Sequence, residues 1–151
     1  MFMTREKLSP AVQALLSTSS HVYSQALIWG DMDAFGHLNN VHFYRYFESA
    51  RIDAINTLGG FAKDGQIVVI AESNCKFLRP VVYPDMLHVG VSIKRLGRTS
   101  LTMHYRMISE AQEALAAEGD AVIVYIGENG KPTPMSDDIR SKLTHWLVEP
   151  S

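Results

Sequence analysis

The chain has 151 residues, 46% of them hydrophobic and 20% charged, and a formal net charge of -2 at pH 7. This length suits one domain with one sizeable core, and the near-neutral charge provides no basic field of the kind that attracts nucleic acid. The one cysteine, Cys75, excludes an intramolecular disulfide, and its place in a strand-like run favours a buried, inert thiol over a nucleophile.

Several other protein classes are disfavoured by the sequence. No apolar run approaches the ~20 residues that cross a bilayer, so we expect no membrane association. No Cys/His cluster has the spacing of zinc ligands, and we expect neither a metal nor another cofactor. The N-terminus lacks a basic segment followed by an apolar one, so we expect a cytoplasmic protein without a secretory signal.

The first elements in chain order are a predicted helix and a predicted strand. Residues 5–17 carry apolar side chains at helical spacing, and the serines that follow break the pattern. We expect residues 1–20 to be an N-terminal extension, a short helix on the surface or on a partner subunit. Residues 21–29 are predicted to form the first strand and lead into a polar loop.

The longest predicted helix starts at Asn39 or Asn40, either of which can cap it with its side-chain oxygen. Gly59 and Gly60 supply the stop, since glycine accepts the left-handed conformation past a helix end. Apolar residues between these signals cover most of the circumference, which is typical of a helix buried on nearly all sides. They are Val41, Phe43, Tyr44, Tyr46, Phe47, Ala50, Ile52, Ala54, Ile55 and Leu58. We therefore expect a sheet to wrap this helix.

The strands of that sheet are predicted downstream of the helix. Residues 66–78 are expected to form one long strand. Two runs with a period of two, residues 87–94 and 101–107, predict a hairpin with one buried face. Residues 114–126 are predicted as a further strand, with Gly119 as a bulge.

The last predicted element is a helix that starts at Ser136 and carries apolar residues from Ile139 to Leu147. We expect residues 136–151 to pack as a C-terminal helix on the domain formed by residues 21–135. Periodicity alone therefore predicts an α+β chain with one domain.

Two stretches resemble a known family. Residues 29–41 read Trp-Gly-Asp-Met-Asp-Ala-Phe-Gly-His-Leu-Asn-Asn-Val, which resembles the signature of the 4-hydroxybenzoyl-CoA thioesterase-like branch of the hotdog-fold superfamily. Residues 77–87 resemble the second landmark of that family, where a strand ends in proline and a Gly-Asp pair opens the next strand, although Pro84 stands in place of the glycine. The resemblance covers roughly residues 22–126. It implies the hotdog fold, an antiparallel sheet wrapped around a central helix.

The start of the long helix is the candidate site for chemistry. Its first turn presents unpaired backbone N–H groups and the positive end of the helix dipole, which polarise a carbonyl and stabilise the oxyanion formed on attack. The resemblance places a thioester carbonyl on the backbone N–H of Asn40. It also matches Asp33 to the catalytic carboxylate, which attacks the carbonyl carbon directly or through one water. The alternatives are that Asp33 only makes an Asx turn around Gly36 and that the asparagines only cap the helix.

Other polar residues have two interpretations each. Glu48 lies among aromatic residues of the helix, where a charge is costly unless it is paired or functional. A related thioesterase branch uses a helix glutamate in catalysis, whereas Arg45 or Arg51, each three residues away, could simply pair with Glu48. His37 orients water or substrate, or is a structural loop residue. Asp31 is expected to be solvated or to support the loop.

The candidate catalytic residues are thus Asp33, Asn40, His37 and Glu48. The candidate substrate-binding residues are Gly36, Asn39, Tyr44, Arg79 and Arg98. The arginines, like Lys94 and Arg95, are candidates for the phosphates of coenzyme A, with solvated surface as the alternative.

The resemblance implies an acyl-CoA thioesterase, which hydrolyses an acyl thioester to a carboxylic acid and a free thiol without a cofactor. The alternatives are a hotdog dehydratase or hydratase acting on acyl thioesters, and a non-catalytic module that binds an acyl thioester. The acyl chain, and its attachment to coenzyme A or to acyl carrier protein, stay open. Strand edges that need cover, together with the family's habit of pairing sheets, predict a homodimer or homotetramer.

Overall fold

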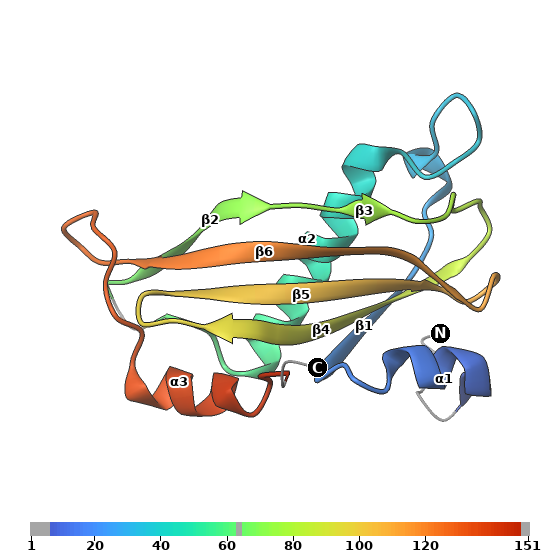
Figure 1. Ribbon diagram of the computed structural model, residues 1–151. Helices are drawn as coiled ribbons and strands as arrows, with labels where there is room; N and C mark the ends of the chain where they lie inside the picture. The colour runs from blue at the N-terminus through green and yellow to red at the C-terminus, as the bar shows by residue number, and fades with distance from the viewer. Residues whose placement is uncertain (1–6, 63–64, 149–151) are drawn as a thin grey trace.

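The computed structural model describes residues 7–62 and 65–148 and shows one antiparallel sheet with a long helix crossing behind it (Figure 1). The sheet order is β1-β4-β5-β6-β2, and β3 also pairs with β6. The expected α+β arrangement of a sheet around a central helix is confirmed. The elements are α1 Pro10–Leu16, β1 His21–Ala26, the 3₁₀ turn η2 Trp29–Asp31, α2 Asn40–Thr57, β2 Ile67–Ser73, β3 Lys76–Phe77, β4 Met86–Leu96, β5 Ser100–Ser109, β6 Ala114–Ile126 and α3 Asp137–Thr144.

Parts of three predicted segments lie outside the described residues. They are residues 1–6 of the expected N-terminal extension, residues 63–64 of the connection after the long helix, and residues 149–151 of the expected C-terminal helix.

The start of α2 decides between the two candidate caps. Asn39 is the N-cap, because its side-chain Oδ1 accepts a hydrogen bond from the Val41 N–H at 3.2 Å, and Asn40 is the first helical residue. At the other end, Gly59 and Gly60 follow the helix with φ angles of 79° and 101°. Both boundary signals of α2 are therefore confirmed.

The expectation that α2 is buried nearly all round is wrong for the single chain. One face packs against the sheet, whereas Val41, Tyr44 and Ile52 are 70%, 39% and 51% exposed. The reason is geometric, since one sheet covers only one side of a helix. The buried residues of α2 are Phe43, Tyr46, Phe47, Ala50 and Ala54.

Three elements are shorter than predicted. The expected strand over residues 66–78 is divided at Asn74 and Cys75 into β2 and β3, which both pair with β6. The expected first strand stops at Ala26, because the chain then turns into η2. The last helix, α3, ends before Trp146, and the residues after it run in an extended conformation beside β4.

The predicted bulge at Gly119 is also wrong. Gly119 pairs directly with Tyr105 of β5, and the register of this strand pair shifts elsewhere, between Met107 and Ile108. The carbonyl of Asn74 lies so close to Gly119 that a Cβ at this position would collide with it. Glycine is needed here because the chain between β2 and β3 approaches the backbone of β6.

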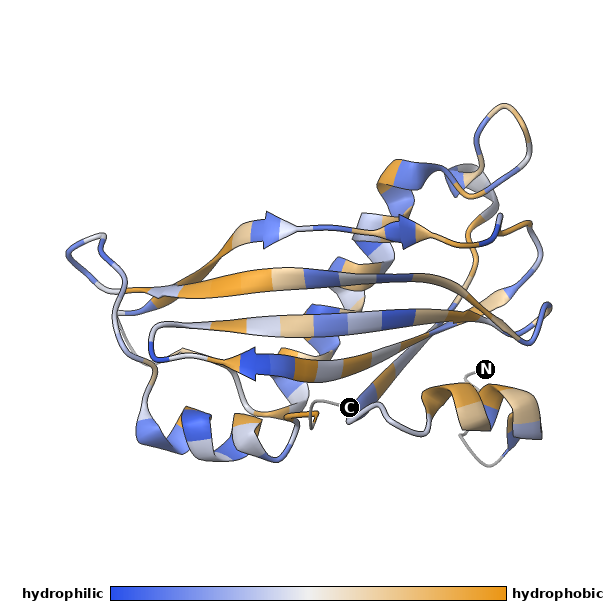
Figure 2. Ribbon diagram, viewed as in Figure 1, coloured by the Kyte–Doolittle hydropathy of each residue, from blue (hydrophilic) through white to orange (hydrophobic). Residues whose placement is uncertain are grey.

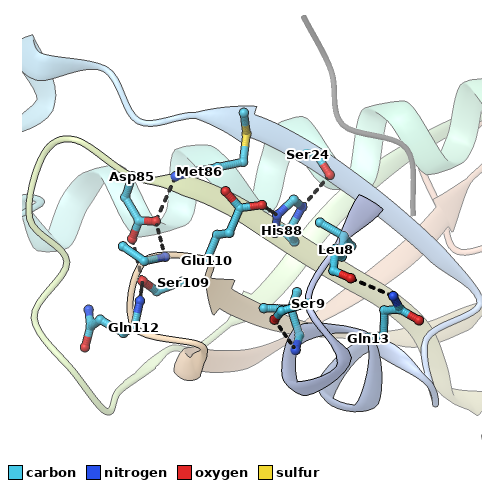
Figure 3. A network of polar contacts seen from close by, with 12 residues as sticks. Leu8, Ser9, Gln13, Ser24, Asp85, Met86, His88, Ser109, Glu110 and Gln112 are labelled. Atoms are coloured by element: carbon cyan, nitrogen blue, oxygen red, sulfur yellow. Dashed lines mark hydrogen bonds and ion pairs between the residues drawn. The ribbon is translucent and has the colours of Figure 1, made fainter. Parts of the chain in front are cut away.

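A polar network holds the adjoining ends of β1, β4 and β5 together (Figure 3). Oδ1 of Asp85 accepts hydrogen bonds from the N–H groups of Met86 and Ala111 at 2.8 and 2.9 Å. The Ser109 hydroxyl donates to the other oxygen of Asp85. The Asp85 carbonyl also accepts from the Leu27 N–H at 2.9 Å. The network therefore fixes the point at which β1 leads into the polar loop.

Candidate active site

The polar loop between η2 and α2 is a tight turn closed by backbone hydrogen bonds. Met32 and Leu38 form an antiparallel bridge across its base. The Asp33 N–H donates to the His37 carbonyl at 2.7 Å, and the Gly36 N–H donates to the Asp33 carbonyl at 3.0 Å. Gly36 has a φ of 78°, in the left-handed region that favours glycine. The loop thus brings Asp33 back beside the start of α2.

The side chain of Asp33 makes an Asx turn. Its Oδ1 accepts hydrogen bonds from the N–H groups of Phe35 and His37 at 2.9 and 3.2 Å. No residue of the described chain bonds to its second oxygen, Oδ2. The Asx turn therefore accounts for one carboxylate oxygen of Asp33 only. The other oxygen is available for chemistry.

A cavity of about 220 Å³, called the Asp33 cavity below, opens between this loop, the start of α2 and the segment around β3. Its polar lining comes from Asp33, His37 and Asn40, and Arg79 also borders it. Its apolar wall includes Phe43 and Phe77, whose rings meet edge to face with centroids 5.0 Å apart. Four of the expected site residues therefore line one cavity, together with two aromatic side chains.

The first turn of α2 borders this cavity through Asn40. The side chain of Asn39 is engaged by the Val41 N–H, and the His42 N–H bonds to the Asn39 carbonyl at 2.8 Å. The N–H of Asn40 has no hydrogen-bond partner among residues 7–62 and 65–148. A carbonyl oxygen at this N–H would also meet the positive end of the helix dipole.

Asp31 was expected to be solvated or to support the loop, and sequence reasoning missed its partner on α2. The hydroxyl of Tyr46, from α2, donates to Oδ2 of Asp31 at 3.0 Å. Oδ1 of Asp31 lies 3.6 Å from Nδ1 of His42. Asp31 therefore supports the loop. A sequence signal was present for Tyr46, because a tyrosine on the buried face of a helix usually needs a partner for its hydroxyl.

Two expected site residues on α2 lie at other cavities. Glu48 pairs with Arg51, its Oε2 lying 3.7 Å from Nη2, and both line a second cavity of about 210 Å³ together with Tyr44 and Tyr105. Glu48 and Tyr44 do not line the cavity that contains Asp33. Within one chain, Glu48 is therefore paired with Arg51, as one of its two interpretations predicted.

The expected phosphate-binding residues are widely separated. Arg79 borders the Asp33 cavity, whereas Arg98 lies in the turn between β4 and β5. This turn is at the opposite end of the sheet from the start of α2 (Figure 1), so one chain does not bring Arg98 to the site. Lys94 pairs with Asp120, with 3.0 Å between Nζ and Oδ2.

A further cavity of about 380 Å³ also borders the loop. It is bordered by Gly36, Asp33, Trp29 and Tyr83. The side chain of Trp29 is 74% exposed there. The loop that carries Asp33 therefore borders two cavities.

Cys75 is disfavoured as a nucleophile at neutral pH. Its thiol is half-buried, and burial raises its pKa to about 11, so the thiolate is scarce at pH 7. In the part of the chain that the structure describes, no group of three His, Cys, Asp or Glu side chains is arranged to hold a metal ion. Nor is any helix within that part long and apolar enough to cross a membrane.

Comparison with known proteins identifies relatives of both sequence and structure. The family model described as the thioesterase-like superfamily matches residues 27–143. The uncharacterized protein YsmA of Bacillus subtilis is 32% identical over 120 residues, which cover 78% of this chain and 80% of YsmA.

Solved structures extend this likeness. The PA5185 protein of Pseudomonas aeruginosa superposes with a TM-score of 0.81 at 24% identity, over 90% of this chain and 97% of that one. A Thermus thermophilus thioesterase, solved in complex with coenzyme A and Zn, superposes with a TM-score of 0.71 at 30% identity, over 83% of this chain and 98% of that one. The hotdog fold implied by residues 29–41 is confirmed.

Proposed function

The chain belongs to the thioesterase-like superfamily, and from this membership we propose that it hydrolyses an acyl-CoA thioester to a carboxylic acid and a free thiol. One observation carries the proposal for this particular site. The unbonded Oδ2 of Asp33 and the unpaired N–H of Asn40 belong to residues that line the same cavity. A carboxylate and an oxyanion donor are the two groups that such a hydrolysis requires.

In the proposed reaction the thioester carbonyl oxygen accepts a hydrogen bond from the Asn40 N–H. Asp33 then either attacks the carbonyl carbon or removes a proton from a water that attacks it. The negative charge that develops on the carbonyl oxygen is stabilised by the same N–H and by the dipole of α2. Collapse of this intermediate breaks the carbon–sulfur bond and releases the thiolate. After direct attack, water hydrolyses the acyl–Asp33 anhydride in a second step.

The remaining lining suits the two ends of the substrate. We place the acyl group against Phe43 and Phe77, since the wall they form is apolar. Arg79 suits a phosphate of the coenzyme A part, because a guanidinium binds phosphate oxygens in a bidentate manner. His37 borders the cavity, and we assign it the orientation of the attacking water. Tyr44 and Glu48 belong to the second cavity, so we assign them no step in the chemistry within one chain.

We also propose that the chain assembles as a homodimer, alone or within a homotetramer. The edge strand β2 pairs with β6 on one side, and its other side has no strand partner among the described residues. Its Ile67, Val69 and Ile70 are 60%, 39% and 41% exposed, and Figure 2 shows the first half of β2 as hydrophobic. A second copy paired along this edge would cover both the open strand and the nearby apolar face of α2.

A thiol-release assay tests the proposed reaction. The full chain is incubated with a panel of short, long, branched and aromatic acyl-CoAs, and with the same acyl groups on acyl carrier protein. Release of free thiol together with the carboxylic acid supports the proposal. Binding of acyl-CoA without thiol release would indicate a non-catalytic module, and a change in the acyl chain with the thioester intact would indicate a hydratase or dehydratase.

A further inference from the structure

Tyr46 is a buried residue of α2 whose hydroxyl joins two segments of the chain. Its side chain is 1% exposed, and its hydroxyl accepts a hydrogen bond from the Ile28 N–H at 3.2 Å. The same hydroxyl donates to Oδ2 of Asp31 at 3.0 Å. The second turn of α2 is thereby tied to both ends of the segment that leads into the polar loop.

Asp31 is also tied to the start of α2 through its backbone. Its carbonyl accepts a hydrogen bond from the N–H of Asn39, the N-cap, at 3.0 Å. The bonds from Tyr46 to Asp31 and from Asp31 to Asn39 close a ring through the first two turns of the helix. Asp33 lies two residues after Asp31, and Asn40 lies one residue after Asn39. The ring therefore holds Asp31 and Asn39, which are close neighbours in the chain of the two groups that the proposed reaction needs.

The Tyr46 hydroxyl keeps its donor role across the range of enzyme assays. Burial is the largest of the effects that raise its pKa to about 12. The phenol is therefore neutral at any pH used for thioester hydrolysis, and the direction of its hydrogen bond to Asp31 does not change. The hydrogen bond that closes the ring is therefore expected to be the same throughout that pH range.

We propose that Tyr46 and Asp31 are positioning residues, which set the distance between the Asp33 carboxylate and the Asn40 N–H in the proposed thioester hydrolysis. They touch neither the substrate nor the reacting atoms in this assignment. Displacing a reacting group by about 1 Å can cost on the order of 100-fold in rate. Their loss is therefore expected to lower turnover while substrate binding by the cavity walls is kept.

The chain offers a matched control for the removal of one buried hydroxyl. Tyr125, in β6, is fully buried like Tyr46, but its hydroxyl has no hydrogen-bond partner in the described part of the chain. Tyr125→Phe therefore deletes the same atom as Tyr46→Phe without breaking a ring. Ser136→Ala controls for lost stability, because it removes the N-cap bond to the Ile139 N–H of α3, outside the Asp33 cavity.

The experiment measures kcat, KM and melting temperature for the wild type, for these three variants and for Asp31→Asn and Asp31→Ala, using an acyl-CoA that the wild type hydrolyses. Tyr46→Phe is expected to lower kcat on the order of 10- to 100-fold, with KM changed less than about twofold. Tyr125→Phe and Ser136→Ala are expected to keep the wild-type kcat. Asp31→Asn retains an oxygen that accepts from Tyr46, so its kcat should exceed that of Asp31→Ala.

Each outcome supports or overturns the positioning role. A wild-type kcat in Tyr46→Phe, or a loss that Ser136→Ala shares at a similar drop in melting temperature, overturns it. An equal loss in Asp31→Asn and Asp31→Ala would also count against it. A wild type that releases no thiol from any acyl-CoA overturns the proposed function, and the positioning role with it. An active wild type with an unaffected Tyr46→Phe overturns the positioning role alone.

Discussion

Asp33 and His37 are joined by two hydrogen bonds. The Asp33 N–H donates to the His37 carbonyl at 2.7 Å, and the His37 N–H donates to Oδ1 of Asp33 at 3.2 Å. The pair closes the loop with the backbone and one carboxylate oxygen of Asp33. The remaining oxygen, Oδ2, is left without a bond in the described chain. A residue that shapes the turn can therefore also supply the reacting carboxylate.

Asp33→Asn separates these two roles. The amide keeps an oxygen that accepts from Phe35 and His37, so the turn and the melting temperature should change little. The negative charge is lost, and turnover should fall ~100-fold or more, as expected for the loss of a general base. Thiol-release kinetics and thermal melting measure both effects.

Glu48→Gln is the comparison for Asp33→Asn. Because Glu48 is half-exposed and paired with Arg51, we expect a smaller loss of turnover from this variant. Near wild-type turnover in Asp33→Asn, together with collapse in Glu48→Gln, would transfer the catalytic role to the helix carboxylate.

Asn40→Pro should remove the oxyanion donor while leaving the helix intact. Asn40 is the first residue of α2, a position at which proline is well tolerated, and Asn39 before it has the extended ψ of 136° that a following proline requires. Loss of one such donor should lower kcat ~100- to 1,000-fold. Asn40→Ala keeps the N–H and should retain most of the activity. Equal activity in the two variants would show that this N–H does not bind the thioester carbonyl.

Gly36→Val should harm activity more than stability. Among the residues that the structure describes, no heavy atom beyond the two chain neighbours lies within 4 Å of a Cβ at this position. The cost therefore comes from the φ of 78°, about 1–2 kcal/mol for a residue with a side chain. Relief of that strain would displace Asp33, with a loss of turnover on the order of tenfold or more. Gly36→Asn should retain more activity, since asparagine tolerates the left-handed region. Full activity in Gly36→Val would mean that the loop geometry is incidental.

Asp120→Asn should destabilise the protein at neutral pH but not in acid. Burial tends to raise the pKa of the Asp120 carboxyl, but hydrogen bonds from His104 and Lys94 outweigh burial and lower the pKa below its ordinary 3.8. A carboxyl with a lowered folded-state pKa stabilises the protein above its unfolded-state pKa, and this contribution is lost as the pH falls through the folded-state pKa. The melting temperatures of wild type and variant should therefore differ at pH 7 and converge below the ordinary pKa. A difference independent of pH would argue against this.

Ile70→Lys should break the proposed dimer. Ile70 lies on the open edge strand and is 41% exposed in the single chain, so the folded monomer accommodates a lysine, whereas a charge on a strand edge opposes pairing with another strand. Sedimentation at micromolar concentration should show a dimer or a tetramer for the wild type and a species of half that size for the variant. Leu147→Lys, at a residue that is 42% exposed outside β2, is the matched control. A wild type that sediments as a monomer would rule out this assembly.

The features that the sequence predicted correctly are set by neighbouring residues. The cap at Asn39 and the stop at Gly59 depend on contacts within a few positions, so the residue types suffice to find them. The resemblance over residues 29–41 likewise named Asp33, His37 and Asn40 as candidate site residues, and all three line one cavity.

The features that the sequence missed depend on the register of distant strands. A glycine within a strand is compatible with a bulge or with the close approach of another backbone, and only the pairing of β2 and β6 shows that Asn74 approaches Gly119. The distance of Arg98 from the site also depends on the direction of β4 and β5, because the turn between them lies at the opposite end of the sheet from the start of α2. The partner of the Tyr46 hydroxyl is 15 residues away across a turn, which no periodic pattern specifies.

The open edge of β2 also bears on how the protein behaves in a crowded solution. Ile67, Val68, Val69 and Ile70 are four consecutive β-branched residues without a charge or a proline, and Glu72 is the first charged side chain after them in the strand. A run of this kind on a free strand edge is a template for amyloid-like stacking. A chain without the proposed partner copy is therefore expected to aggregate more readily, and neutralising Glu72 is expected to speed that aggregation.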